Sequence, residues 1–362
     1  MRSFIFSSNT IRLSWKNWVV VICIFILIFS LFPQFWGAIE KFNPSSSYRL
    51  PYILSSDYWM FRQWCKSACT EYPALIIGDS VVWGQYVRKD RTLSHFLNDM
   101  AGKDMFANTG VDGIHPAAMV GLINYFGKDI EHKNVIINLN PLWMSSIKHD
   151  LSSEEEFRFN HPRLVPQIIP DIACYRPSFN VIMGVVLERN IPFFSWLNHI
   201  RINHFENLNI QNWNIQNPYV NPLSVINLEI PVPDNNPKSK PITWQERGIK
   251  TQNFPWIPAD ESFQWSSFKR VIKILIEREN NIYILFGPFN PYILTEESCQ
   301  RFQSMKSDME KWFLENNLSY YSVPDLPSDY YADGSHPLKE GYKKIAVDLF
   351  KTESFKKWMK NL

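Results

Sequence analysis

The chain has 362 residues, of which 45% are hydrophobic and 20% are charged, enough to form a sizeable hydrophobic core and more than most single α/β domains need. Its formal net charge of +2 gives no strong electrostatic field and argues against nucleic acid as a partner. The aromatic content of 15% fits a large core with a membrane-interface belt, or contacts to sugars and lipids.

A long apolar segment lies close to the N-terminus. Residues 18–32 carry no charge, and apolar character continues in patches to Ile39, so about 22 residues are available to cross roughly 30 Å of hydrocarbon. The sequence therefore predicts a short tail at 1–17, a transmembrane anchor at 18–39 and a large domain that follows them.

Flanking residues indicate the orientation and fate of this segment. Arg2, Arg12 and Lys16 precede it, and positive charge before a span predicts a cytoplasmic N-terminus with the large domain outside the membrane. A cleaved signal peptide is the alternative, but Phe35 and Trp36 occupy the place where cleavage needs small residues. A retained membrane anchor is therefore the favoured interpretation of this segment.

After a connector at 40–73, a short apolar run over 75–77 predicts a buried strand that ends at Gly78. Residues 85–100 carry apolar side chains close to helical spacing, so Ser80 falls on the turn between strand and helix. This geometry suits a nucleophilic serine whose own N–H helps to hold an oxyanion. Asp-Ser is also common at helix N-caps, so the motif alone is weak evidence for catalysis.

The pattern of strand and helix repeats through residues 74–149. The elements expected next are a strand at 104–106 with a loop over 107–113, a helix over 116–125, and a strand over 134–143 that Pro141 stops. Alternating strands and helices predict an α/β fold with a parallel sheet, in which ligands bind beyond the carboxyl ends of the strands. Ser80, Gly110 and Asn140 all fall at such ends.

Residues 150–258 interrupt the α/β pattern. We expect a helical part over 181–201, broken at Pro192, followed by an extended arm over 203–258 that is rich in Asn, Pro and aromatic residues. This insertion either packs as a loop over the core or forms a surface for a substrate or partner. The α/β pattern resumes in 259–362, with helices expected at 261–278, 297–316 and 340–350 and strands at 282–286 and 320–323.

A serine nucleophile needs a base that takes its proton and an acid that orients the base. His336 follows Asp333 by three residues, in a loop between the last expected strand and the last helix, so one turn can present both side chains to the same pocket. Asp-Gly-Ser is also ordinary turn chemistry. His115 is the rival base, in the loop beside Gly113, but it lacks a comparable carboxylate pattern beyond Asp112.

Four short motifs occur in the order of the SGNH, or GDSL, hydrolase family, which the chain resembles. They are Gly78-Asp79-Ser80, Asn108-Thr109-Gly110, Asn138-Leu139-Asn140-Pro141 and Asp333-Gly334-Ser335-His336. The resemblance covers roughly residues 74–143 and 282–350 and leaves out the insertion. It implies a three-layer, flavodoxin-like fold with helices on both faces of the parallel sheet.

The resemblance also implies a role for each matched residue. Ser80 would be the nucleophile, His336 the base and Asp333 the acid that orients it. The N–H groups of Ser80 and Gly110 and the side chain of Asn140 would form the oxyanion hole. The resemblance implies no cofactor, and no Cys/His spacing in the sequence resembles a metal site.

The third motif departs from the family pattern of Gly-x-Asn-Asp. Asn138 replaces the Gly and Pro141 replaces the Asp, so Asn138 is the alternative to Asn140 in the oxyanion hole. The stretch Asn140-Pro141-Leu142-Trp143 is also similar to the Ser-Pro-Gln-Trp element of the D-alanyl transfer protein of the lipoteichoic-acid system.

Membrane-tethered SGNH proteins often work beside membrane-bound O-acyltransferases and acylate envelope or exported polysaccharides. The resemblance thus implies an acyltransferase or esterase that handles acyl groups, acetyl above all, on a cell-envelope glycan through an acyl-Ser80 intermediate. The anchor and the aromatic insertion favour transfer over hydrolysis. The alternative is a non-catalytic scaffold or binding subunit of a membrane acyltransferase complex.

Overall fold

The core of the computed structural model, which describes residues 13–360 apart from Ser46 and Asp234, is a five-stranded parallel sheet. Its strand order is β2-β1-β3-β4-β5, and every neighbouring pair is parallel. The strands are β1 (Ala74–Ile77), β2 (Phe106–Asn108), β3 (Asn134–Leu139), β4 (Asn281–Phe286) and β5 (Ser319–Ser322). The predicted α/β fold with a parallel sheet is confirmed.

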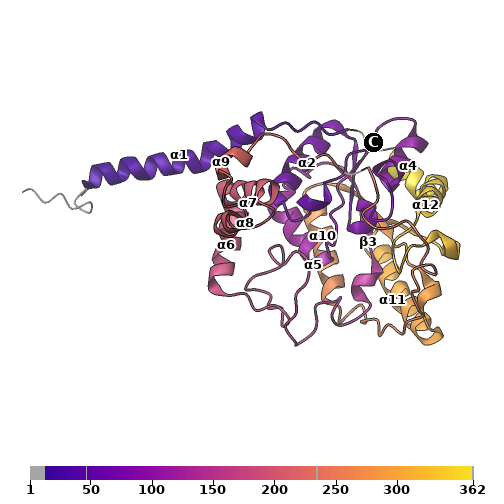
Figure 1. Ribbon diagram of the computed structural model, residues 1–362. Coiled ribbons are helices and arrows are strands. Elements are labelled where there is room, and N and C mark those ends of the chain that lie inside the picture. Colours follow the sequence, from indigo (N-terminus) through magenta and orange to yellow (C-terminus); the bar gives the residue numbers. More distant parts are fainter. Residues whose placement is uncertain (1–12, 46, 234, 361–362) are drawn as a thin grey trace, which may run out of the picture.

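Helices cover both faces of this sheet (Figure 1). One face packs against α2 (Tyr58–Glu71), α5 (Pro116–Gly121), α10 (Phe263–Glu277) and α11 (Glu296–Glu315), and the other against α4 (Leu93–Ala101), α12 (Lys339–Lys351) and α13 (Glu353–Met359). Leu75 and Ile77 face the first layer, whereas Ala74 and Ile76 face the second. Because both faces are buried, β1 reads as a continuous apolar run.

Short helical turns join these elements. They are η1 (Tyr52–Leu54), η2 (Lys89–Arg91), the π-helical η3 (Leu122–Phe126) that continues α5, η4 (Pro141–Met144), η5 (Pro291–Ile293) and η6 (Ser328–Tyr330). The turn η4 follows the carboxyl end of β3, and η6 precedes the loop that carries His336.

The helix expected over 85–100 is shorter than its pattern indicates, because it begins only at Leu93 as α4. Before it lies a separate helix, α3 (Ser80–Trp83), which is only four residues long and ends at Gly84, a residue in the left-handed conformation with φ of 89°. The guanidinium of Arg49 donates to carbonyl oxygens in this turn, at 2.7 Å from that of Gly84 and 3.1 Å from that of Trp83. A left-handed glycine terminates a helix, so the helical spacing further on belongs only to α4.

The apolar N-terminal segment forms one long helix, α1 (Trp15–Ile39), which extends away from the body of the protein (Figure 1). Within the described part of the chain it is the one helix long and apolar enough to cross a membrane. Most of its side chains are exposed, unlike those of a core helix, so it could serve as a membrane anchor or as a signal sequence. Arg2 and Arg12, on which the orientation depends, lie outside the described residues.

The insertion is more helical than its sequence indicates. Helices α6 (Phe179–Asn190) and α7 (Pro192–His204) break at Pro192 as expected, but α8 (Ile210–Gln216) and α9 (Pro222–Val225) fold within the region expected to be extended. Asn209 and Asn221 are their N-caps, with side-chain oxygens that accept from the N–H groups of residues 212 and 223. Asparagine ends an extended segment and starts a helix equally well, which explains the difference.

A buried ion cluster joins α1, α2 and α7. His199 on α7 bonds through Nδ1 to Asp57, the N-cap of α2, at 2.6 Å, and through Nε2 to Glu40, just past α1, at 2.7 Å. All three side chains are almost completely buried. Burial alone would lower the pKa of His199, but the two carboxylates raise it to about 10. His199 therefore carries its proton at neutral pH.

Replacing His199 with asparagine is expected to destabilise the protein by about 3–5 kcal/mol, because two buried carboxylates lose their cationic partner. Thermal unfolding of full-length protein at pH 7 measures this. Since the folded pKa of His199 is raised, its contribution is complete below about pH 6.5 and is lost as pH rises through about 10. His132→Asn is the matched control, because His132 is exposed and pairs only with exposed carboxylates. Equal losses in both variants would contradict this account.

Candidate active site

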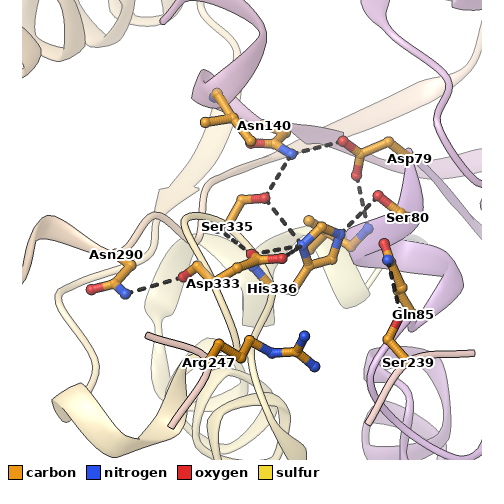
Figure 2. A network of polar contacts seen from close by, with 12 residues as sticks. Asp79, Ser80, Gln85, Asn140, Ser239, Arg247, Asn290, Asp333, Ser335 and His336 are labelled. Carbon is orange, nitrogen blue, oxygen red and sulfur yellow. Dashed lines mark hydrogen bonds and ion pairs between the residues drawn. The ribbon is translucent and has the colours of Figure 1, made fainter. Parts of the chain in front are cut away.

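Ser80 lies just beyond the carboxyl end of β1, as the first residue of α3. Its Oγ is 2.8 Å from Nε2 of His336, although 256 positions separate the two residues in the chain. Ser80 is 7% exposed, so its hydroxyl group stands at a nearly closed surface. Figure 2 shows the two side chains directed at each other.

Asp333 holds the other side of the imidazole. Its two carboxylate oxygens lie 2.8 and 2.9 Å from Nδ1 of His336, and Oδ1 also accepts from the N–H groups of Ser335 and His336, each at 3.0 Å (Figure 2). A carboxylate only accepts, so Nδ1 carries the hydrogen and the lone pair of Nε2 faces Ser80. This is the tautomer that can remove a proton from the serine hydroxyl.

The loop around Asp333 is held by the chain that follows β4. The side chain of Asn290 donates to the carbonyl of Asp333 at 3.1 Å, and its backbone N–H donates to the carbonyl of Gly334 at 2.9 Å. The hydroxyl of Tyr331 donates to the carbonyl of Phe289 at 2.8 Å. The sequence shows Gly287-Pro288-Phe289-Asn290 as the end of a strand, but nothing in it connects Asn290 with Asp333.

Asp333 and His336 shift each other's pKa values in opposite directions. Burial alone would raise the pKa of Asp333, but the imidazole of His336 and two backbone N–H groups hold it well below its ordinary range. Burial would lower the pKa of His336, but Asp333 first, and then Asp79 and Asp112, raise it above its ordinary value. The carboxylate therefore stays ionised where His336 titrates, because the pKa of His336 is raised and that of Asp333 is lowered.

Any reaction in which neutral His336 accepts a proton should consequently slow as pH falls through the raised pKa of this residue. Asp112→Asn removes one of the charges that raise this pKa, so the acid limb of the kcat/KM profile should move to lower pH. Hydrolysis of an activated acetyl ester, followed over a pH series for the unaltered protein and the variant, measures the position of this limb. Asp104→Asn, at an exposed position before β2, is the control and should leave the profile in place. A shift to higher pH in Asp112→Asn would contradict the assigned electrostatics.

Asn140 lies at the N-cap of η4, just beyond the carboxyl end of β3. Its amide nitrogen donates to Oδ2 of Asp79 at 2.7 Å and lies 3.3 Å from Oγ of Ser335 (Figure 2). Asp79 also accepts from the indole N–H of Trp143 at 2.9 Å and caps α3 by accepting from the N–H of Val81 at 2.9 Å. Asp79 therefore fixes the position of Asn140 relative to Ser80.

Asn138 and Gly110 are placed differently from Asn140. The amide nitrogen of Asn138 donates to the carbonyls of Leu285 and Gly287, at 3.2 and 2.6 Å, so this side chain joins β3 to β4. The N–H of Gly110 donates to the side chain of Asn108 at 3.0 Å. A Cβ at position 110 would stand 2.6 Å from the backbone nitrogen of Trp83, so glycine is needed there for close packing against α3.

His115 is not placed beside Ser80. It is the N-cap of α5, where Nδ1 accepts from the N–H of Ala118 at 3.3 Å and Nε2 donates to the carbonyl of Asn160 at 3.1 Å. Burial first, and then His161, lowers its pKa to about 3. Both ring nitrogens are thus used within the fold.

Several residues around the triad have no signal in the sequence motifs. The ring of Tyr86 and the imidazole of His336 meet in an edge-to-face contact, with centroids 5.3 Å apart. The guanidinium of Arg247, from the insertion, lies over the ring of Tyr86, 4.3 Å from its centroid. Ser239 of the insertion also meets Gln85, through both backbone and side chain (Figure 2). The insertion therefore reaches the site.

Two hollows border this region. One of about 390 Å³ is lined by Tyr86, Pro237 and Leu338 among others, and one of about 320 Å³ includes Asp112 and Lys238. Each therefore combines residues of the α/β core with residues of the insertion. In the described part of the chain, no group of three or more His, Cys, Asp or Glu side chains could hold a metal ion.

Comparison of the sequence with models of known protein families found no match, and neither did comparison with curated proteins.

Proposed function

We propose that the protein is a serine-dependent acyltransferase or esterase that works through an acyl-Ser80 intermediate. The observation that supports this most strongly is the line of contacts from Ser80 Oγ to His336 Nε2 and from His336 Nδ1 to Asp333. In this mechanism Nε2 takes the serine proton while Oγ attacks the acyl carbonyl. The proton then passes to the departing alcohol, and water or a sugar hydroxyl releases the acyl group.

The oxyanion of the tetrahedral intermediate would be held by the N–H of Ser80 and the amide of Asn140. Asn140 donates only weakly to Ser335, at 3.3 Å, and can exchange this contact for an oxyanion while it keeps its shorter bond to Asp79. Gly110 would join them only if its N–H left the side chain of Asn108. Asn140 is favoured over Asn138, whose amide hydrogens are used by β4.

The resemblance to SGNH hydrolases agrees with this proposal. The four motifs come from separate parts of the chain, and Ser80, Asn140, Asp333 and Ser335 belong to one hydrogen-bonded network with His336 (Figure 2). A non-catalytic subunit would have no need for a base that faces the serine in its proton-accepting tautomer.

We further propose that α1 is a retained membrane anchor and that the large domain lies outside the cytoplasm. Supporting this, Phe29 and Trp36 of α1 pack against aromatic rings of α7, with Phe29 4.4 Å from Phe193 and Trp36 5.7 Å from Trp196 between centroids. A cleaved signal sequence would leave these rings uncovered. Protease added outside intact spheroplasts is expected to digest the protein beyond Lys41, and protection of the large domain would contradict this topology.

The anchor suggests the class of substrate. Tethering raises the effective concentration of an acyl donor or acceptor at the membrane, which suits O-acyl groups, acetyl above all, on a cell-envelope glycan and a membrane-bound O-acyltransferase as partner. Three tryptophans of the insertion add little to this argument, because Trp213 and Trp256 are buried and the indole N–H of Trp244 donates to Ser328. The anchor is therefore the main reason to favour transfer over hydrolysis.

The test is to incubate the full-length protein with an activated acetyl ester, with and without envelope oligosaccharides, and to identify the products by mass spectrometry. Acetylated oligosaccharide that is absent with Ser80→Ala would support transfer. Free acetate alone, again dependent on Ser80, would support a deacetylase. Turnover that does not depend on Ser80 would overturn the proposal and favour the alternative hypothesis of a non-catalytic scaffold subunit.

A further inference from the structure

Helices α6, α7 and α8 form a helical group beside the C-terminal part of α1, at the edge of the body from which α1 departs (Figure 1). Their outer surface is unusually apolar. The exposed apolar side chains of this surface are Phe179, Val181, Met183, Val186, Leu197, Ile210 and Ile215. A helix whose outer face meets water normally carries charged residues on that face.

Charge is nearly absent from this part of the chain. Besides the buried His199, residues 179–227 contain only four charged side chains, Glu188, Arg189, Arg201 and Glu206, and no lysine. Glu188 is buried in an ion pair with Arg163 at 2.7 Å, and Arg189 donates to the carbonyls of residues 163 and 165. The outer face of α6 is therefore left with apolar groups and amides only.

Contacts between α7 and α1 indicate where along α1 this group of helices lies. His199 is level with Glu40, beyond the end of α1; Trp196 packs on Trp36; and Phe193, at the start of α7, packs on Phe29. The two helices thus run in the same direction, and the turn between α6 and α7 lies nearest the N-terminal side of α1. Phe29 lies about 10 Å from Trp36 along the helix axis.

We infer that α6 and the first half of α7 are embedded in the outer leaflet of the membrane, beside α1. This inference rests on the proposed role of α1 as a membrane anchor. If Trp36 marks the interface, the start of α7 reaches about 10 Å into the bilayer, which is the depth typical of helices that lie in the interface. The occupant of the apolar face is therefore the acyl chains of the lipid.

A groove among these helices has a mainly apolar lining. Its volume is about 450 Å³, and its apolar lining includes Val181, Val185, Phe194, Leu197 and Ile200. Its polar lining consists of the paired Arg163 and Glu188, together with Arg201, Asn198 and Asn209. An embedded group of helices would fix the catalytic domain at one height and tilt above the membrane, which a single anchor helix cannot do.

The depth can be measured with an environment-sensitive fluorophore on single cysteines of the full-length protein in nanodiscs. Exposed Cys23 and partly exposed Cys299 are replaced by alanine first, whereas Cys65, Cys69 and Cys174 are buried. The label is placed at Val186→Cys on α6, at Phe25→Cys on α1 as the lipid reference, and at Ile276→Cys on α10 as the water reference, all at exposed apolar positions.

Brominated lipids are expected to quench the label at 186 nearly as strongly as that at 25 and several-fold more than that at 276. Quenching at 25 but not at 186 would overturn the inference and leave the anchor intact. Absence of quenching at 25 would show instead that the anchor proposal itself fails. Circular dichroism and thermal unfolding verify that each variant is folded.

A photoreactive phosphatidylcholine, with the reactive group on its acyl chain, tests the unaltered protein. Cross-linked peptides from residues 179–197 are expected in addition to those from α1. Cross-links confined to α1 would contradict an embedded α6.

Discussion

Replacing Ser80 or His336 with alanine is expected to lower kcat for an activated acetyl ester by roughly 10⁴–10⁶-fold. The serine hydroxyl and the imidazole are 2.8 Å apart and act as one unit, so either loss should remove nearly all of the covalent route. The double variant should lose little more than either single one, because residues that act together are not additive.

Two control variants make this result specific. Ser304→Ala alters an exposed serine of α11 and should leave kcat unchanged. His115→Ala removes a buried N-cap, so it should reduce thermal stability more than kcat of the folded fraction. Near-normal rates in His336→Ala together with large losses in His115→Ala would show that the base has been assigned incorrectly.

Asp333→Asn is the second large effect, expected to lower kcat by about 10⁴-fold while it leaves more activity than Ser80→Ala does. The carboxylate accepts from Nδ1 and from two backbone N–H groups, and an amide has one acceptor oxygen for these three donors. The imidazole then loses the contact that keeps its hydrogen on Nδ1, and its pKa falls as the negative charge is removed.

The matched control is Asp325→Asn, an exposed aspartate in the same connection between β5 and α12, and it should keep the activity of the unaltered protein. Circular dichroism and thermal unfolding verify that both variants are folded. Loss of less than tenfold in Asp333→Asn would mean that another group orients His336.

The arrangement of the core could be predicted from local patterns. Strands such as β1 and β3 are buried on both faces, so each appears as an apolar run, and glycine or proline marks its end. Ser80, Gly110 and Asn140 could be assigned to one edge because parallel strands end together. The contact between Asp333 and His336 depends only on a single turn of the chain, so it too could be predicted from their three-residue spacing.

What could not be predicted depends on distant segments. Asn140 and Asn138 have identical side chains, and only the pairing of β3 with β4 turns Asn138 into the sheet and leaves Asn140 beside Asp79. Tyr86 and Arg247 meet near His336 because the insertion folds back, which no local pattern indicates. The Asn-rich arm contains N-caps for two short helices, a use of asparagine that composition does not distinguish from a loop.

The central claim is that His336 activates Ser80 as a covalent nucleophile. A fluorophosphonate reacts with serines activated in this way, so the most direct measurement is the intact mass of the full-length protein after exposure to such a probe, followed by peptide mapping. The account predicts one adduct per chain, on the peptide that contains Ser80, absent in Ser80→Ala and formed far more slowly in His336→Ala. An unmodified Ser80, or an adduct on another serine that forms at the same rate in His336→Ala, would contradict it.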